Sequence, residues 1–426
     1  MKRFWLVLLT LGLVMAFSTS VFAADVKFTG SYYVAGMYMD STTLRGNGQD
    51  KPSTAFYYQR MRIQAEFIAT PALKLITRFD AMERMWGHVR STVPLVTVND
   101  VDSYGTRAEN ENIAFDYAYI WYASKIGLWQ VGIMEDSVWG TVFGDNSEPE
   151  GKITYTFIKM PFVAGLQIVK FNEFSDNAVN ASIYSDRDVD KYQGFFIYNW
   201  KGGQAGLLCI FINNRSLKPN FWPTPSTYAQ KIYGALPFVK AKFGPVAVEA
   251  EAWYLGGKVM KWEDDLPAVL RPLNDIDLSA WSVYVNAVAD FNMFYFGGTF
   301  AYMSGDDPDT ADKVEGGPGT ATGGRDWNPC LIMFNWDRNY WQGALNGYGV
   351  TSDAGVMSNA YFFQLKAGAR PISDLDLAMS VSYAKADKLP TGYFEKDYGW
   401  EVDVTATYKI TNNLSYMLGA GYLFTG

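Results

Sequence analysis

The chain is organised as pairs of alternating segments joined by very short turns. The clearest pair covers Phe56–Thr70 and Leu73–Arg84, with Pro71 in the turn, and a second pair covers Asn112–Ala123 and Leu128–Glu135. Residues that alternate with a period of two face opposite sides of a strand. Longer polar loops separate the pairs. Short turns on one side and long loops on the other are typical of a transmembrane β-barrel.

The alternation assigns a side to each residue of the first pair. Positions in phase with Met61 are apolar, whereas those in phase with Arg60 are charged or polar. A charge at the bilayer centre costs roughly 2–4 kcal/mol, so lipid must contact the apolar set. The residues expected to face lipid are Met61, Ile63, Ala65, Phe67, Leu75, Phe79 and Ala81. Those expected to face the aqueous lumen are Arg60, Arg62, Gln64, Glu66, Lys74, Arg78, Asp80 and Arg84.

Two further segments follow the same rule. One continuous apolar face is expected from Ile113, Phe115, Tyr117, Tyr119 and Trp121. Near the end of the chain, an apolar face of Trp400, Val402, Val404 and Ala406 alternates with a polar face of Glu401, Asp403, Thr405 and Thr407. We expect the apolar faces to contact lipid and the polar face to contact water.

Seventeen segments of this kind predict an all-β fold, a transmembrane antiparallel β-barrel of 16–18 strands. They cover residues 26–38, 56–69, 73–85, 111–123, 128–135, 152–158, 163–172, 191–200, 204–213, 229–242, 246–256, 277–290, 293–303, 359–369, 375–385, 399–409 and 414–424. Single-chain bacterial barrels have an even number of strands, and an open edge in lipid leaves backbone groups unpaired. Either a strand within 304–358 is overlooked or, as we favour, the sequence stops one strand before closure.

The N-terminus has the features of a secretory signal peptide. Lys2 and Arg3 precede the apolar run Phe4–Phe17, and Ala23 provides a small residue for cleavage. This predicts a signal peptide over 1–23 and one outer-membrane barrel over 24–426. No later segment reaches the roughly 18 consecutive apolar residues of a membrane helix.

Composition agrees with an exported barrel. Hydrophobic residues make up 49% of the chain, yet the mean hydropathy is −0.08, because polar and apolar residues are interleaved. The 28 Tyr and 14 Trp suit aromatic girdles at the membrane interfaces. Without Lys2 and Arg3, 34 basic residues stand against 44 acidic ones, a net charge of −10. This balance argues against a nucleic-acid partner.

Catalytic and metal chemistry have little support. A Ser-His-acid triad would have to use the single histidine, His88, which lies in a loop. No His/Cys cluster offers metal ligands, and no C-x-x-C-H motif binds haem. The acidic run Gly305–Asp309 could hold Ca²⁺ or be a solvated loop. Cys209 and Cys330 could form a disulfide or remain free. We predict no enzyme activity, no catalytic residue, no cofactor and no metal site.

Opposed charges form the strongest candidate site. Lumen-facing arginines of the first pair lie near Glu83 and other acids, and the loop Asp136–Glu150 is acidic and carries bulky Trp139 and Phe143. If this loop enters the lumen, it narrows the pore and sets a field across it. Alternatively, the arginines pair with lumen carboxylates and fill space. The predicted constriction residues are Arg60, Arg62, Arg78, Asp80, Arg84, Asp116, Asp136, Asp145 and Glu148.

Several motifs carry a resemblance to a known family. They are Tyr57–Arg62, Thr77–Asp80, Trp139–Thr141, Phe143–Asp145, Ser304–Asp307, Gly399–Asp403 and Gly419–Tyr422. With these motifs the chain resembles outer-membrane porins of Gram-negative, Desulfobacterota-type bacteria and, more distantly, alginate-export-like barrels. The resemblance implies a porin of the outer membrane, among lipid and lipopolysaccharide. It also implies passive transport of small hydrophilic solutes and ions, a homotrimer, and a third loop that constricts the pore. The customary last strand with a terminal aromatic residue is missing.

Three alternatives stay open at this point. A substrate-specific channel, for example for an acidic oligosaccharide, would use the same arginines as a ladder. A barrel that surrounds a periplasmic cytochrome would be a scaffold for an electron-transfer partner. A barrel hydrolase is the enzyme alternative, and the single histidine counts against it.

Overall fold

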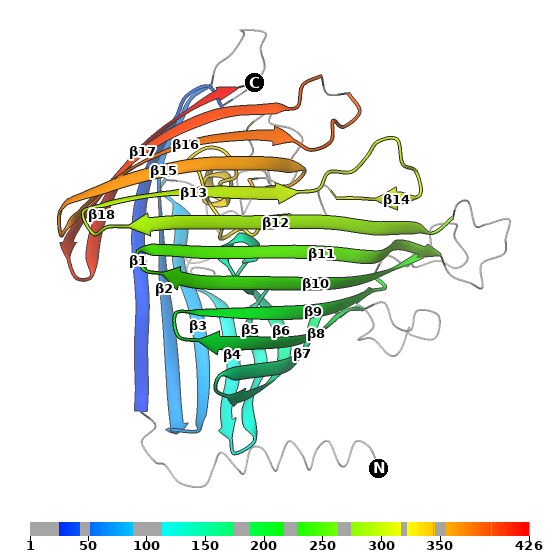
Figure 1. The fold of residues 1–426 in the computed structure, drawn as a ribbon. Helices are drawn as coiled ribbons and strands as arrows, with labels where there is room; N and C mark the ends of the chain where they lie inside the picture. The colour runs from blue at the N-terminus through cyan, green and yellow to red at the C-terminus, as the bar shows by residue number, and fades with distance from the viewer. Residues whose placement is uncertain are drawn as a thin grey trace, which may run out of the picture.

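The computed structural model describes residues 25–42, 52–87, 113–173, 188–216, 228–262, 274–316, 322–343, 345, 355–392 and 394–425. The predicted signal peptide and His88 lie outside these ranges. Within them, one sheet contains nearly all of the regular structure and curls into the wall of a barrel (Figure 1). No helix in the described part is both long and apolar enough to cross a membrane.

Seventeen long strands build this wall. They are β1 (Asp25–Met39), β2 (Thr54–Thr70), β3 (Leu73–Met85), β4 (Ile113–Ser124), β5 (Gly127–Asp136), β6 (Glu148–Lys159), β7 (Phe162–Asn172), β8 (Val189–Trp200), β9 (Gly203–Asn214), β10 (Tyr228–Phe243), β11 (Val246–Trp262), β12 (Ile276–Asp290), β13 (Phe294–Met303), β15 (Ala360–Ile372), β16 (Leu375–Ala386), β17 (Asp397–Thr411) and β18 (Leu414–Thr425). Each one coincides with one predicted segment, so the predicted fold class is confirmed.

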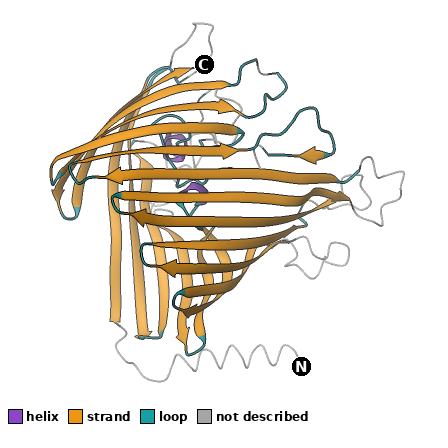
Figure 2. Ribbon diagram, viewed as in Figure 1, coloured by secondary structure: helices purple, strands orange, loops and turns teal. Residues whose placement is uncertain are grey.

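Three short elements lie between the long strands. β14 (Lys313–Val314) pairs in parallel with β12, so the region 304–358 does contain an overlooked strand, but one of two residues. The 3-10 turn η2 (Val142–Gly144) and the helix α3 (Trp336–Gln342) belong to loops. Figure 2 shows both helical segments, in purple, within the outline of the curved sheet.

The long strands pair antiparallel in chain order from β1 to β18, with β13 joined to β15. Among the described residues, no pairing joins β18 to β1. Both of these strands start at the short-turn end of the barrel, because Asp25 is in register with Ile68 and β18 follows the turn after Thr411. The two edges therefore run in the same direction, as the strand count predicts.

The charge pattern confirms the predicted sides of β2 and of β3 as far as Ala81. Arg62 donates hydrogen bonds of 2.7 and 2.6 Å to Asp80, and Lys74 donates one of 3.1 Å to Glu66, so the predicted lumen residues meet on one face. Phe67, by contrast, is exposed on the opposite face of β2. Antiparallel partners share a face of the sheet, which explains why these charges find one another.

The predicted apolar face of β4 is wrong over half of the strand. Arg78 is in register with Tyr117 whereas Phe79 is in register with Phe115, so Asp116 is an extra residue in a β-bulge. Phe115 still faces outward, but the alternation reverses beyond the bulge. The side chains that move from the predicted lipid face to the lumen are Tyr117, Tyr119 and Trp121. The bulge also brings Asp116 to the arginines.

A second bulge corrects the position predicted for Arg84. Met82 has a positive φ of 55° and is the extra residue on β3. Glu83 therefore joins the lumen face, where it pairs with Arg60 at 3.5 Å. Arg84 lies in register with Gln59, on the face of the sheet that points away from the lumen.

The bulge at Asp116 generates a test of the side assignments. Ile120 is in phase with the outward face beyond the bulge, and its neighbour Tyr119 with the lumen face. We expect Ile120→Lys to lower the free energy of unfolding by about 2 kcal/mol, because a lysine in contact with lipid is costly. Tyr119→Lys, at the same depth, should have a smaller effect. Urea unfolding of both variants in lipid vesicles measures this, and the opposite order contradicts the assignment.

Candidate functional site: a lumen crossed by two loops

The loop between β5 and β6, residues 137–147, folds back on itself before it meets the wall. Asp145 accepts a hydrogen bond of 2.7 Å from the backbone N–H of Trp139, and Asn146 donates one of 2.9 Å to the carbonyl of Ser137. Thr141 caps η2 by accepting a hydrogen bond from the N–H of Phe143. These contacts make a compact unit, which we call the first inserted loop.

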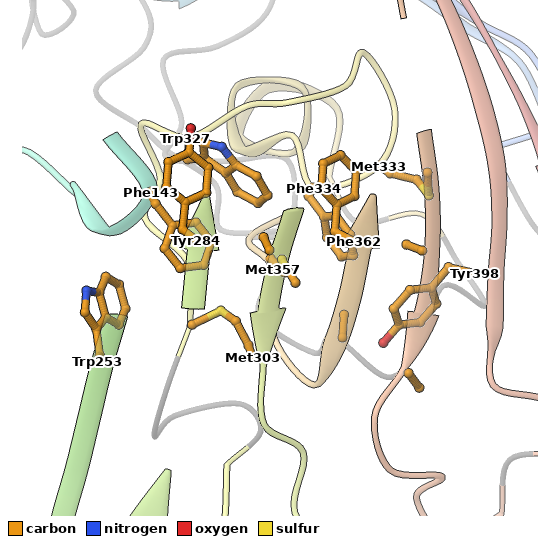
Figure 3. Packing of buried hydrophobic residues seen from close by; sticks show 14 of the residues in the cluster. Phe143, Trp253, Tyr284, Met303, Trp327, Met333, Phe334, Met357, Phe362 and Tyr398 are labelled. Atoms are coloured by element: carbon orange, nitrogen blue, oxygen red, sulfur yellow. The ribbon is translucent and has the colours of Figure 1, made fainter. Parts of the chain in front are cut away.

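Phe143 fixes the first inserted loop against the lumen wall. Its ring is fully buried and stacks on Tyr284 of β12, with ring centroids 4.9 Å apart and planes 7° apart. Trp253 of β11 and Trp327 also pack against it, with centroids 5.4 and 5.0 Å away. Figure 3 shows these four rings together. Aromatic pairs of this kind add about 0.5–1.5 kcal/mol each beyond the area that they bury.

A buried carboxylate of the wall holds the backbone of the same loop. Glu251 of β11 accepts a hydrogen bond of 2.6 Å from the N–H of Thr141 and one of 2.6 Å from the indole of Trp253. Gly144 leaves room for this close approach, because a Cβ there would lie 1.9 Å from the Trp253 ring. The first inserted loop therefore starts at β5 and docks on β11 and β12.

A second inserted loop, residues 322–343, lies against the first. The N–H of Gly324 donates a hydrogen bond of 2.7 Å to the carbonyl of Phe143, and the N–H of Asp326 donates one of 3.0 Å to the carbonyl of Asp145. The side chain of Arg325 forms an ion pair with Glu148. The two loops thus form one structure inside the barrel.

The second inserted loop docks on β15–β17. Glu401 of β17 accepts hydrogen bonds of 2.6 and 2.7 Å from the backbone N–H groups of Ile332 and Met333. Phe334 packs edge-on against Phe362 of β15 and Tyr398 of β17. The right half of Figure 3 shows this part of the buried cluster.

The helix α3 of the second inserted loop lies against β2, near the predicted lumen residue Arg60. Trp341 stacks on Tyr58 of β2, with centroids 4.6 Å apart and planes 25° apart. Asp337 interacts electrostatically with the Arg60 guanidinium. Burial raises the pKa of the Asp337 carboxyl, and the positive charge of Arg60 opposes that rise. An acid of α3 therefore faces the basic part of the wall.

Four predicted constriction residues of the wall, Arg62, Arg78, Asp80 and Asp116, form one ion-pair network, and a separate Arg60–Glu83 pair lies beside it. Besides the Arg62–Asp80 pair, Asp116 lies 3.2 Å from Arg78 and 3.5 Å from Arg62. Together with Arg60 and Glu83, three arginines and three carboxylates balance one another. Arg62 keeps 28% of its side chain exposed and Arg60 keeps 32%, so both remain open to a solute in the lumen.

The predicted acids of the loop Asp136–Glu150 do not meet these arginines. Asp136 pairs with Lys152 at 3.3 Å and with Lys191. Asp145 accepts a hydrogen bond from Trp139 within the first inserted loop, and Glu148 forms an ion pair with Arg325. Asp337 takes the place expected for them. No periodic pattern pointed to Asp337, because it lies in the longest region without a spanning strand.

The remaining wall carries a continuous polar row that sequence reasoning missed. Cross-strand partners place these residues side by side on nine successive strands: Asn199, Gln204, Lys240, Glu249, Asn286, Thr299, Gln364, Ser382 and Glu401. Asn286 bonds to Glu249 at 3.1 Å and accepts from Thr299 at 3.0 Å. Because the row crosses successive strands, no single strand reveals it.

The row begins in a cavity of about 500 Å³ near the short turns. Asn199, Gln204, Lys240, Glu249 and Asn286 line this cavity. From there the row climbs to Glu401 beneath the second inserted loop. It therefore gives the lumen hydrogen-bonding groups from the short-turn end to the loops.

The remaining sequence candidates have structural partners. Asp307 of the acidic run pairs with Lys388 at 2.7 Å, and Asp306 accepts a hydrogen bond of 3.0 Å from the N–H of Glu315. Cys209 and Cys330 are free thiols, the first exposed and the second buried. The structure therefore contains no disulfide between them.

Comparisons with known proteins support the fold. No protein-family model and no curated protein matches the sequence. OpdK of Pseudomonas aeruginosa, an outer-membrane protein, is similar in structure, with a TM-score of 0.51, 13% identity and 93% of each chain covered. A structure of OpdK with vanillate gives a TM-score of 0.50 and 13% identity, again over 93% of each chain. OccK11 (OpdR) of the same organism gives 0.50 and 11% identity over 94% of this chain and 90% of that one. The fold is that of an outer-membrane, porin-type β-barrel.

The electrostatics of the first inserted loop generate a prediction. Burial raises the pKa of Asp145 to about 7; the Trp139 N–H opposes this, and Glu251 and Asp326 add to it. The Asp145 carboxyl binds its proton more tightly when the loop is docked, so protonation of Asp145 stabilises the docked loop. This stabilisation is fully present below about pH 4 and is lost as the pH rises through about 7. We expect the hydrogen-exchange protection factors of amides 139–146, which are corrected for intrinsic rates, to fall at least tenfold between pH 5 and pH 8.

Asp145→Asn should remove this pH dependence, whereas Asp309→Asn, in an exposed loop, should leave it unchanged. Equal pH dependence in wild type and Asp145→Asn contradicts the prediction.

Proposed function

We propose that this chain is an outer-membrane porin that lets small hydrophilic solutes and ions diffuse passively through its lumen. The observation that carries the proposal is the docking of two loops on the lumen wall, where they meet at Phe143. We infer that they narrow a lumen that would otherwise be wide. Barrels of this strand number are too wide for wall side chains to fill. Selection then follows from the size of the remaining passage and from the charges along it.

The charges beside this passage are the ion-paired arginines of β2 and β3, faced by Asp337 of α3. The polar row continues the route towards the short-turn end with amides and hydroxyl groups. Such a surface can replace the hydrogen bonds that water makes to a hydrophilic solute. It provides few favourable contacts for an apolar solute. Assembly as a homotrimer and contact with lipopolysaccharide are further parts of the proposal, carried by the resemblance alone.

The direct test measures conductance in planar lipid bilayers. We expect the full-length protein to form ion-conducting channels and Phe143→Ala to raise the single-channel conductance, because loss of the anchor releases the first inserted loop. Truncating a buried Phe costs about 3–5 kcal/mol, enough to undock a loop. Val142→Ala, at the exposed neighbouring position, is the control. A membrane that stays insulating at high protein occupancy would contradict the porin proposal. Equal conductance of the Phe143→Ala and Val142→Ala variants would show that the first inserted loop does not constrict the pore.

The arginine network generates a prediction for ion selectivity. Removing two of its cations in the double variant Arg60→Ala, Arg78→Ala leaves a local net charge of about −2, so the reversal potential in a salt gradient should shift towards cations. The double variant Arg60→Ala, Glu83→Ala removes one cation and one anion and should leave the reversal potential near that of wild type. No shift in either variant places the network outside the ion path, and a shift of the same size in both shows that its net charge does not set the selectivity.

A channel specific for an acidic solute is the second candidate. It is favoured by the exposed fractions of Arg60 and Arg62, and one similar structure, OpdK, was solved with vanillate. Such a channel would show saturable block of its conductance by a single acidic solute, whereas a general pore would show none.

A further inference from the structure

A buried cluster of potential metal ligands lies where the second inserted loop meets β17. Glu401 is fully buried and Asp403 is 5% exposed; they lie two residues apart on β17 and so share its lumen face. Cys330 of the loop covers them and is 3% exposed. The Sγ of Cys330 and one oxygen of each carboxylate all lie within 4.8 Å of one another.

These two carboxylates have no cationic partner in the described part of the chain. Glu401 accepts hydrogen bonds from two backbone N–H groups, and Oδ2 of Asp403 accepts one of 3.3 Å from the N–H of Leu331 and one of 3.5 Å from the hydroxyl of Ser380. The other oxygen, Oδ1 of Asp403, is buried and has no hydrogen-bond partner. Buried charges are normally paired or coordinate a metal. Elsewhere in this lumen, Asp80 and Asp136 follow the rule with Arg62 and two lysines.

We propose that Cys330, Glu401 and Asp403 bind a divalent transition-metal cation of the Zn²⁺ class. A thiolate with two carboxylates suits zinc and similar cations, whereas Mg²⁺ and Ca²⁺ take oxygen ligands only. A tetrahedral zinc centre holds sulfur and oxygen ligands about 3.5 Å apart, given bonds of about 2.3 and 2.0 Å. The three ligand atoms, which lie within 4.8 Å of one another, would have to draw closer to reach that spacing.

The cation would replace the missing positive charge and would also fasten the loop. Cys330 belongs to the segment whose N–H groups bind Glu401, so a shared metal ties this segment to β17. The position of α3 depends on the same segment. Metal binding would therefore hold the second inserted loop across the lumen, and this role does not depend on whether the barrel conducts ions.

The test uses Co²⁺ as a spectroscopic substitute for Zn²⁺. The full-length protein is unfolded with a chelator and refolded in detergent with Co²⁺, because the cluster is buried once the loop has docked. We expect a near-ultraviolet thiolate-to-cobalt charge-transfer band that saturates near one Co²⁺ per chain and disappears when Zn²⁺ is added. Cys330→Ser should lose the band. Cys209→Ser, which removes the exposed cysteine on β9, should keep it.

A second measurement covers the case in which Cys330→Ser does not fold. Wild-type protein refolded with Zn²⁺ should show at least tenfold slower alkylation of Cys330 by a maleimide than protein refolded with chelator, with Cys209 alkylated equally in both. Mass spectrometry of the peptides distinguishes the two thiols. No charge-transfer band in wild type, or alkylation of Cys330 that Zn²⁺ does not change, would show that the carboxylates share a proton instead and would overturn the proposal.

Discussion

The hydrogen bonding of the backbone in lipid is the constraint on which this structure depends. Each N–H and C=O that crosses the membrane needs a partner within the protein, since lipid offers none. Antiparallel pairing of the seventeen long strands satisfies this need between neighbouring strands and at the same time fixes which side chains face outward. The bulges at Met82 and Asp116 each insert an extra residue where its own side chain or that of its neighbour gains an ion pair.

The lumen follows from a second requirement, which is that the loops must find partners inside the barrel. Both inserted loops solve it in the same way. A buried glutamate of the wall accepts backbone hydrogen bonds from each loop: Glu251 accepts one from the first loop, and Glu401 accepts two from the second. An aromatic side chain beside it, Phe143 or Phe334, then packs into the wall. Polar wall positions thus serve as docking sites for the loops as well as a surface for solutes.

The fold was predictable because its signal is local. Alternation over ten residues, a short turn and a second alternation identified every long strand, and the charges of β2 identified its lumen face. The failures are also local in origin. Tyr117, Tyr119 and Arg84 were placed on the wrong side because a single extra residue reverses the phase, and a bulge leaves no mark that simple alternation can detect.

The candidate site was predictable only in part. Arg60, Arg62, Arg78, Asp80 and Asp116 do come together, because strands adjacent in sequence are adjacent in the sheet. The partners of Asp136 and Glu148 were not predictable, since Lys191 and Arg325 reach them from distant segments. The position of Asp337, the polar row and the cluster around Cys330 were unpredictable for the same reason. The polar row comes from nine different strands, and the cluster joins a loop to β17.

The sequence by itself determined the barrel, its strands and the polarity of its two faces, because a period of two in contact with lipid allows few other solutions. The tertiary structure decided what occupies the lumen. Loop docking depends on which side chains meet across the barrel, and curvature, register and bulges set those meetings. Phe143 on Tyr284 and Cys330 beside Glu401 are meetings of this kind: each joins residues far apart in sequence, which the curved wall brings together.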